Sequence, residues 1–303
     1  MKREKEVERT PNMPPPACEV ITHLPSLAPR AADSNKGTFG RVLIVAGSRG
    51  MSGAAVLCAS AALRGGAGLV YLAVPQEVQP IVAAANPCYL TADLSQDEQG
   101  CLAESAQGRL LQLVQEKDVI GFGPGLSRSP AILALLTSLL TEVGVPIVID
   151  ADGLNALEGH TSRLKQRSGP AILTPHPGEF ARLLGSDIAT IQTERKGLAM
   201  RFAADHQVIL VLKGHATLVT DGRRLYQNTT GNAGMATGGT GDVLTGLIAA
   251  LLGQGLDPFA AAQLGVYLHG LAGDLARDHL SEVSLIASDL LVYLPRVFRN
   301  FLG

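Results

Sequence analysis

The sequence predicts an α/β protein in three layers, with a mostly parallel central sheet, helices on both faces of the sheet and a hairpin at one edge. From residue 41 onward, short runs rich in Val and Ile alternate with longer Ala- and Leu-rich segments of helical period. This alternation is typical of a parallel sheet covered by helices. Several of the short runs are apolar at successive positions, as strands buried on both faces require. The chain has 303 residues, 46 % of them apolar and 17 % charged, so it can bury a large core without disulfides.

The expected strands follow one another through the first two thirds of the chain. They cover residues 42–46, 70–74, 119–122, 147–149, 172–174 and 208–212. Two further segments, residues 216–220 and 224–227, flank the turn signal Asp221-Gly222, which predicts a hairpin at the edge of the sheet. Three helices are expected to complete the fold, over residues 243–252, 258–278 and about 286–301.

The composition changes only near the N-terminus. Residues 1–9 form a mixed charged run, and residues 11–16 are rich in proline. We therefore expect residues 1–35 to be a disordered arm and residues 36–303 to be a single domain. The arm lacks the apolar core of a secretory signal, and no stretch reaches the about 18 uninterrupted apolar residues of a membrane span. The sequence thus predicts a soluble, cytoplasmic protein.

Charge and cysteine content argue against several kinds of partner. The formal net charge of −2 and a pI near 6.4 provide no basic field for nucleic acid. The four cysteines, Cys18, Cys58, Cys88 and Cys101, show no C-x-x-C spacing. Neither a zinc site nor a disulfide framework is therefore expected.

A glycine-rich segment, residues 231–241, leads through Asp242 directly into a predicted helix. Glycines let successive backbone N–H groups converge, and the free donors and positive dipole end of the helix add to them, so the segment predicts a phosphate site. Asp242 is placed to act as a general base, taking a proton from an attacking hydroxyl while the loop stabilises the transferring phosphoryl group. The alternative is a loose turn with Asp242 as an ordinary N-cap. No Walker A sequence occurs, which excludes a P-loop enzyme.

Polar side chains also follow two of the predicted strands, at the end where open parallel sheets bind ligands. In residues 174–179, T-P-H-P-G-E, His176 and Glu179 are placed to reach a substrate or a hydrated metal. They would otherwise cap a turn and complement a helix dipole. Lys213, beside the permissive Gly214, can approach a phosphate.

Three more strand ends carry candidate segments, and two of these segments have two open interpretations. Residues 150–155, D-A-D-G-L-N, either hydrogen-bond a substrate or cap the next helix. Residues 121–125, G-F-G-P-G, allow close approach of the backbone to a ligand but lack the dinucleotide-binding spacing. Residues 47–54 form either a wall of the same crevice or a plain strand-to-helix turn.

Taken together, these segments resemble one family. The matching pieces run in order from about residue 36 to residue 295: K-G-T-F-G-R at Lys36, A-G-S and M-S-G-A-A in residues 46–55, G-F-G-P-G-L at Gly121, D-A-D-G-L-N at Asp150, T-P-H-P-G-E at Thr174, L-K-G-H-A-T at Leu212 and N-A-G-M-A-T-G-G-T-G-D at Asn232. The sequence resembles the NAD(P)H-hydrate dehydratases. The resemblance implies a ribokinase-like fold and the repair of hydrated nicotinamide cofactors. In that family a nucleotide phosphorylates the hydroxyl of the 6S hydrate, NADHX or NADPHX, and loss of phosphate restores NADH or NADPH.

The resemblance also implies roles for single residues. The hydrate is expected to contact Ala54, Gly123, Gly125, His176 and Asp242, with Asp242 as the base. The nucleotide is expected to be held by Lys213, Gly214, His215, Ala216, Thr217 and Gly241. Related kinases carry an N-x-x-E element near the metal, and His176 to Glu179 resembles it with His in place of Asn. Glu179 is therefore expected to reach Mg²⁺ through water.

Donor and partners follow from the same resemblance. Enzymes of this type from bacteria and archaea use ADP and those of eukaryotes ATP, so ADP is the expected donor and ATP the alternative. Many relatives carry a fused N-terminal epimerase domain, whereas about 35 residues precede the match here, so a separate epimerase is expected to convert the 6R hydrate. A homo-oligomer is expected, with residues 260–273 as either an interface or core.

Two other functions stay open at this point. A small-molecule kinase of the thiazole or pyridoxal type also resembles the glycine loop and its aspartate, although the T-P-H-P-G-E segment argues against it. The other is a nucleotide sensor without catalytic activity, for which Asp242 would not matter.

Overall fold

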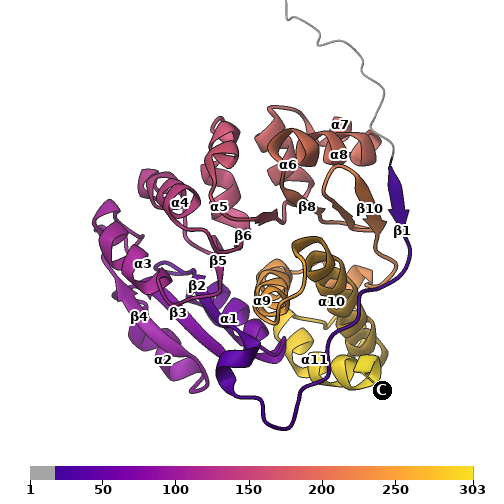
Figure 1. Cartoon of the computed structure of the whole chain (residues 1–303), viewed down its shortest axis with the longest axis horizontal. Coiled ribbons are helices and arrows are strands. Elements are labelled where there is room, and N and C mark those ends of the chain that lie inside the picture. Colours follow the sequence, from indigo (N-terminus) through magenta and orange to yellow (C-terminus); the bar gives the residue numbers. More distant parts are fainter. Residues whose placement is uncertain (1–17, 303) are drawn as a thin grey trace, which may run out of the picture.

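A computed structural model describes residues 18–302 of the chain. Its centre is a ten-stranded sheet in the order β1-β10-β9-β8-β7-β6-β5-β2-β3-β4, which curves through the molecule in Figure 1. The strands are β1 (Glu19–Ile21), β2 (Arg41–Val45), β3 (Leu69–Pro75), β4 (Leu90–Leu94), β5 (Val119–Phe122), β6 (Ile147–Ile149), β7 (Ala171–Leu173), β8 (Ile209–Leu212), β9 (Leu218–Thr220) and β10 (Arg224–Gln227).

The predicted mostly parallel sheet is confirmed. Strands β2 to β8 pair only in parallel with one another, whereas β9 is antiparallel to both β8 and β10. Each predicted strand lies within two residues of an observed one. Strand β4 was not predicted, because its sequence L-T-A-D-L is mostly half-exposed or exposed and lacks the continuous apolar run of the central strands.

Residues 18–35 show that the expected disordered arm is wrong for this part of the chain. Strand β1 pairs in parallel with β10, and the side-chain amide of Gln263 donates to the carbonyl oxygen of His23 at 2.6 Å. Such hydrogen bonds and apolar contacts offset the entropy lost on ordering a chain terminus. The edge strand is therefore β1, and the predicted edge hairpin, β9 and β10, lies one strand further in. The rest of the predicted arm, residues 1–17, lies outside the described residues.

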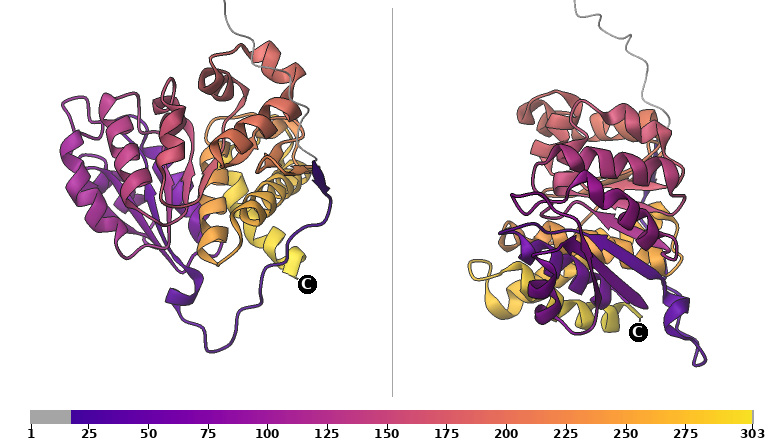
Figure 2. Two further views of the ribbon diagram at one scale, coloured as in Figure 1. Left: turned by 45° about the horizontal axis from the view of Figure 1, so that its top comes forward. Right: turned by 90° about the vertical axis from the view of Figure 1, so that its left-hand side faces the viewer.

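Helices cover both faces of the sheet, as Figure 2 shows. One face packs against α1 (Ser52–Arg64), α2 (Gln79–Ala85), α9 (Thr240–Gly253), α10 (Pro258–Leu280) and α11 (Ala287–Leu302). The other packs against α3 (Gln107–Val114), α4 (Pro130–Glu142), α5 (Ala151–Ala156), α6 (Pro177–Leu184), α7 (Ile188–Thr193) and α8 (Arg195–His206). The three predicted C-terminal helices are confirmed as α9, α10 and α11. Most residues of helix α10 are buried in the core that α1, α2, α9 and α11 form on their face of the sheet. Residues 260–273 are therefore core rather than an interface.

Successive residues of the central strands supply the two cores in turn. In β2, Val42 and Ile44 belong to one core and Leu43 and Val45 to the other, and all four are fully buried. This is the two-residue period of a strand covered on both faces. It explains why these strands read as continuous apolar runs in the sequence. Among residues 18–302, no helix has the length and apolar character needed to cross a bilayer.

Helices α1 and α9 pack closely where Gly246 faces the backbone of Cys58. A Cβ at Gly246 would overlap the carbonyl oxygen of Cys58, so Gly246→Ala must push the two helices apart. We expect this substitution to lower the free energy of unfolding by about 1–3 kcal/mol, measured by urea denaturation. Gly197→Ala in α8 is the control, because within the described chain a Cβ there has no atom within 4 Å. It should stabilise the protein by about 0.5–1 kcal/mol, and equal effects at the two positions would contradict the packing argument.

Candidate active site

Helix α9 begins at an open end that faces the carboxyl ends of the parallel strands. Its N-cap is Gly239, whose φ of 93° lies in the left-handed region that glycine favours. Among the described residues, no side chain caps this helix end. The backbone N–H groups at Thr240 and Gly241 can therefore bind an anion, helped by the helix dipole. Asp242 is the third helical residue, so its alternative interpretation as the N-cap is wrong.

A cavity of about 660 Å³ opens beside this helix end. Its walls are the turn after β8, the segment between β10 and α9, and one side of α10. All six residues predicted to hold the nucleotide line it, namely Lys213, Gly214, His215, Ala216, Thr217 and Gly241. Further lining residues that the sequence did not indicate include Asn228, Thr230, Val266, His269 and Arg277. Lys213 and Gly241 are 28 positions apart in the sequence. The fold brings the two predicted nucleotide-binding segments together at one cavity.

The turn at residues 213–217 has an unusual backbone that a distant arginine supports. Gly214 and Ala216 both have positive φ, 128° and 53°. The guanidinium of Arg195 in α8 donates to three carbonyl oxygens of this turn and the end of β8, at 2.7 to 3.3 Å. The role of Arg195 cannot be predicted from the sequence, because no local pattern connects it with residues about 20 positions further on. Its effect is to hold the mouth of the cavity in one shape.

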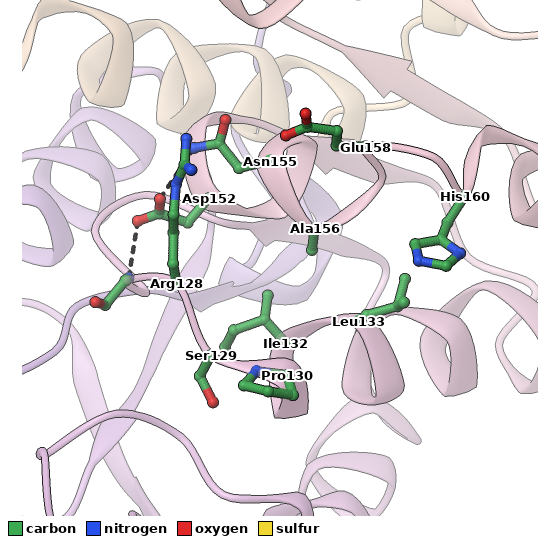
Figure 3. A pocket seen from close by; sticks show the side chains of 11 residues that line it. Arg128, Ser129, Pro130, Ile132, Leu133, Asp152, Asn155, Ala156, Glu158 and His160 are labelled. Carbon is green, nitrogen blue, oxygen red and sulfur yellow. Dashed lines mark hydrogen bonds between the residues drawn. The ribbon is translucent and has the colours of Figure 1, made fainter. Parts of the chain in front are cut away.

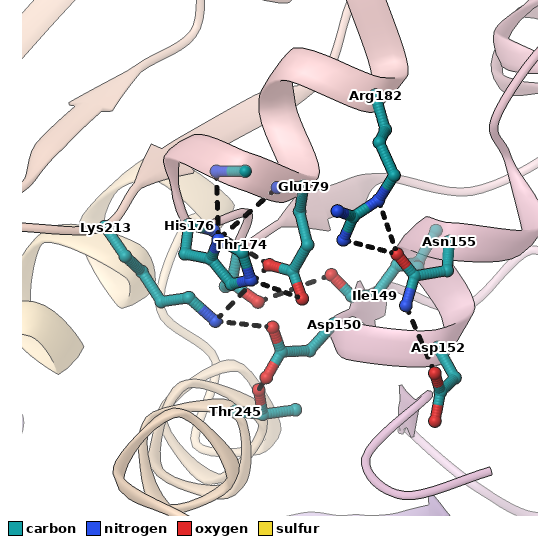
Figure 4. Close-up of polar contacts among 11 residues, drawn as sticks. Ile149, Asp150, Asp152, Asn155, Thr174, His176, Glu179, Arg182, Lys213 and Thr245 are labelled. Carbon is teal, nitrogen blue, oxygen red and sulfur yellow. Dashed lines mark hydrogen bonds and ion pairs between the residues drawn. The ribbon is translucent and has the colours of Figure 1, made fainter. Parts of the chain in front are cut away.

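Lys213 lies between two carboxylates and the glycine loop. Its Nζ atom is 2.8 Å from Oδ1 of Asp150 and 3.9 Å from Oε2 of Glu179, as Figure 4 shows. A Cβ at Gly241 would lie 3.1 Å from the same Nζ atom, so the ammonium group lies close beside Gly241. Burial alone would lower the pKa of Lys213, but the two carboxylates outweigh this effect and raise it. The lysine therefore carries a positive charge beside the predicted phosphate site.

Asp150 anchors this lysine at the carboxyl end of β6. The side chain is 1 % exposed and accepts a second hydrogen bond, from the Thr245 hydroxyl of α9 at 2.8 Å. The sequence left open whether residues 150–155 bind a substrate or cap a helix. Asp150 stands at the N-cap position of α5, yet its carboxylate oxygens accept from Lys213 and Thr245 instead. This carboxylate joins β6, β8 and α9 at the site.

His176 caps helix α6, and its ring stays half exposed. Its Nδ1 accepts from the backbone N–H groups of Gly178 and Glu179, while Glu179 Oε2 accepts from the backbone N–H of His176 at 2.8 Å. Because Nδ1 accepts, the proton of the neutral ring is on Nε2. Burial, followed by the charges of Lys213 and Arg182, lowers the pKa of His176 and keeps the ring neutral. The side chain is 51 % exposed, and its Nε2 atom lies 3.5 Å from Oε1 of Glu179.

Glu179, predicted to contact a metal through water, is mainly engaged with protein groups. Its side chain is 7 % exposed, and its carboxylate contacts the backbone of His176 and the Lys213 ammonium. Burial raises the pKa of Glu179 above its ordinary value. Within residues 18–302, no group of three or more His, Cys, Asp or Glu side chains can hold a metal ion directly. A hydrated Mg²⁺ held chiefly by phosphate oxygens and water fits these donors.

Among the carboxyl groups of the site, that of Asp242 has the pKa that departs most from its ordinary value. Burial, reinforced by the negative charge of Asp150 and opposed by Lys213, raises its pKa from 3.8 to about 7. A carboxylate with this pKa can accept a proton near neutral pH far better than an ordinary aspartate. Asp242 directly follows Gly241, which lines the cavity, so a proton acceptor and the anion-binding helix end are adjacent.

Of the three small residues predicted to contact the hydrate, Ala54 lies in the first turn of α1, and Gly123 and Gly125 lie in the loop after β5. A Cβ on Gly125 would come within 2.8 Å of the Ala54 side chain, and one on Gly123 would overlap the carbonyl oxygen of Asp150. Both glycines have positive φ, 62° and 124°. The loops after β2, β5 and β6 therefore meet backbone to backbone at the same edge of the sheet, as the sequence predicted for strand ends.

A second cavity, of about 490 Å³, lies between α4 and α5 (Figure 3). It borders a chain of hydrogen bonds in which Ser127 N–H donates to Asp152, Asn155 donates to Asp152, and Arg182 donates to Asn155. Asp152 and Asn155, from the predicted segment 150–155, line this cavity, whereas the residues predicted to hold the nucleotide line the 660 Å³ cavity. Lys213, Asp150 and the Asp242 carboxyl with its raised pKa lie on the side of the glycine loop, which is therefore the candidate active site.

Comparison with known proteins identifies the family. The sequence pattern of the NAD(P)H-hydrate dehydratase family matches residues 42–296, which is most of the chain. The chain belongs to this family. A bifunctional NAD(P)H-hydrate repair enzyme of Moorella thermoacetica is 50 % identical over 273 residues, covering 89 % of this chain and 51 % of that protein. The chain thus spans about half the length of such bifunctional relatives.

Shorter dehydratases match over nearly their whole length. An ADP-dependent (S)-NAD(P)H-hydrate dehydratase of Neisseria meningitidis is 40 % identical over 277 residues, covering 89 % of this chain and 88 % of that protein. A crystal structure of the ADP/ATP-dependent dehydratase of Bacillus subtilis, co-crystallised with ATP and Mg²⁺, has a TM-score of 0.79 at 34 % identity, covering 91 % of this chain and 94 % of that one. A ribokinase-like protein of Enterococcus faecalis gives the same TM-score at 26 % identity, covering 94 % and 96 %. The predicted ribokinase-like fold of this dehydratase-family chain is therefore confirmed.

Proposed function

We propose that this chain dehydrates the 6S hydrate of NADH or NADPH, with ADP as phosphoryl donor and ATP as the alternative donor. The observation that carries the proposal is the adjacency of Asp242, a carboxyl with a pKa of about 7, to the open helix end beside the cavity. Two relatives support it: one is named for ADP-dependent hydrate dehydration, and one was crystallised with ATP and Mg²⁺.

In this proposal the nucleotide lies in the 660 Å³ cavity with its phosphates toward α9. The turn at residues 213–217 holds the nucleoside side, and Lys213 and the N–H of Gly241 contact the phosphates. Mg²⁺, when bound, would neutralise phosphate charge, held by phosphate oxygens and waters with Glu179 acting through water. The hydrate lies opposite, against Ala54, Gly123, Gly125 and His176, with the Nε2–H of His176 as a donor.

Asp242 then accepts the proton of the hydrate hydroxyl as its oxygen bonds to the terminal phosphorus and the bond from that phosphorus to the donor breaks. Backbone N–H groups at the start of α9 stabilise the charge on the transferring group. In the second step the carbon–oxygen bond breaks, phosphate leaves, and a proton is lost from the neighbouring carbon. The double bond of the reduced nicotinamide is restored.

Incubation with chemically prepared hydrate, Mg²⁺ and either ADP or ATP tests substrate, donor and reaction together. Recovery of reduced-nicotinamide absorbance together with one inorganic phosphate per turnover is the expected result. A kinase of the thiazole or pyridoxal type would release a stable phosphate ester instead. Hydroxyethylthiazole kinase of Pyrococcus horikoshii is 19 % identical with a TM-score of 0.57, a likeness that concerns the fold alone.

The same proposal extends to a second activity outside this domain. The Moorella relative is named bifunctional, and the match covers 51 % of it. We propose that an epimerase acting on the 6R hydrate works alongside this domain. With a mixture of the two hydrates, turnover would then stop when the 6S form is consumed and resume on addition of an epimerase.

Turnover should depend on pH through Asp242. The base must be ionised, so kcat/KM should rise about tenfold per pH unit below the pKa of about 7 and level off above it. A ¹³C NMR titration of the aspartate carboxyls gives the same pKa directly, with Asp242→Asn assigning the signal. A profile that is already level at pH 5 would contradict the role of a raised carboxyl pKa.

A further inference from the structure

His269 on α10 contacts the glycine loop at the residue before Gly241. Its Nε2 atom is 2.8 Å from the carbonyl oxygen of Thr240. Because a carbonyl oxygen can only accept, Nε2 must carry the ring proton and donate it. The bond joins two segments 29 residues apart, and the predicted site does not include His269.

The carbonyl of Thr240 and the N–H of Gly241 belong to one planar peptide unit. In a trans peptide the oxygen and the N–H point in opposite directions, so a donor that holds the oxygen also fixes the direction of the N–H. A donor on the oxygen polarises the same amide and makes its N–H a stronger donor. This amide lies beside the Lys213 ammonium, on the wall of the nucleotide cavity.

We propose that His269 is a positioning residue, which aims the Gly241 N–H at the transferring phosphoryl group through the Thr240 carbonyl. The inference rests on the proposed function for its catalytic consequence. In this role His269 acts through the peptide unit between Thr240 and Gly241 and not by touching the phosphates.

The surroundings of His269 suit this task. Burial lowers the pKa of His269 to about 4; the hydrogen bond to Thr240 opposes this shift, and the charge of Lys213 adds to it. The ring is thus neutral through the physiological range and keeps a single donor on Nε2. An imidazolium at this place would add positive charge and a second donor without improving the direction of the amide.

Helix α10 also holds the other end of the glycine loop. The carboxylate of Asp274 accepts from the backbone N–H of Gly231 at 2.8 Å and from the side-chain amide of Asn232 at 3.1 Å. Residues 231–241 have few side chains that could pack against the rest of the protein. The hydrogen bonds at the two ends of this loop therefore restrict its motion. Helix α10 therefore serves as a rigid support on which the flexible loop is fixed.

Three substitutions test the inference. His269→Phe keeps the ring and removes the donor, whereas His269→Gln keeps an N–H at nearly the same distance. Losing an N–H from an oxyanion hole lowers kcat by about 10² to 10³. Here the N–H remains, but its amide is no longer held and polarised by the imidazole, so we expect H269F to lower kcat about tenfold to a hundredfold, with a smaller change in the KM for ADP. H269Q should recover most of this loss. His279→Phe, on an exposed histidine of the same helix whose ring contacts Leu275 O at 2.8 Å, should leave kcat unchanged.

Hydrogen exchange of the Gly241 amide gives a measurement that does not need turnover. ADP with Mg²⁺ should protect this amide in the wild type and in H269Q, and much less in H269F. If H269F matches the wild type in both measurements, or H269Q is impaired as strongly as H269F, the inference is wrong. If the wild type does not turn over the hydrate but the exchange pattern holds, the proposed function fails while the positioning role stands. Should H269F fail to fold, His269→Asn replaces it, because its shorter side chain cannot reach the Thr240 oxygen.

Discussion

Asp242→Asn should lower kcat about a thousandfold while the protein still binds ADP. Removing a general base costs about 10² to 10⁴ in rate, and asparagine is nearly isosteric with aspartate but cannot accept the hydroxyl proton. Nucleotide binding depends on the backbone of α9 and on Lys213, which this change leaves in place. Single-turnover recovery of reduced-nicotinamide absorbance gives the rate, and calorimetry gives the dissociation constant of ADP.

The same substitution should make the protein more stable. The pKa of Asp242 is about 7 in the folded chain against an ordinary value of 3.8. Between these values the unfolded chain has lost the proton that the folded chain keeps, so stability falls as pH rises. Asparagine never ionises, and Asp242→Asn should therefore raise the free energy of unfolding at pH 8 by at most about 4 kcal/mol.

Asp205→Asn provides the matched control, because Asp205 is an exposed aspartate at the end of α8. It should change neither kcat nor stability by a measurable amount. If Asp242→Asn turned over the hydrate at the wild-type rate, the base would have to be another group. A nucleotide sensor without catalysis would respond to ADP equally well with either residue.

The elements that could be predicted are those whose own residues form a clear hydrophobic pattern. The central strands are buried on both faces and therefore appear as unbroken apolar runs, as in β5 and β6. Strand β4 lies at the end of the sheet and is partly exposed, which removes that signal. Strand β1 has three residues and depends on pairing with β10, about 200 residues away, so nothing in its own sequence distinguishes it from a loop.

The candidate site divides in the same way. Gly241, Asp242 and Lys213 were predicted because each stands in a short motif whose chemistry can be read from neighbouring residues. Thr245 and His269 were missed, because their partners are 95 and 29 positions away. Both are ordinary helix residues by sequence, and only the packing of α9 against β6 and α10 gives them a role. Local motifs thus indicate which groups do chemistry, while tertiary packing decides what holds them.

Lys213→Met should have the second largest effect, because it removes the positive charge between Asp150 and Glu179. Breaking a buried ion pair costs about 3–5 kcal/mol of stability when the partner charge is left unpaired, and Asp150 is 1 % exposed. The loss also removes a charge that holds the pKa of Asp242 down. The rising limb of the pH profile should therefore move above pH 7, and ADP should bind more weakly. Lys165→Met, at an exposed lysine, should change none of these quantities.

A second substitution separates the structural role of Lys213 from its role at the phosphates. Asp150→Asn removes the carboxylate that is left unpaired in Lys213→Met, so the double variant should regain most of the lost stability in urea denaturation. It should not regain the affinity for ADP, because no ammonium group then faces the Gly241 amide. If the double variant recovered both, Lys213 would act only by neutralising Asp150. If it recovered neither, the ion pair at 2.8 Å would not be the interaction that stabilises this part of the fold.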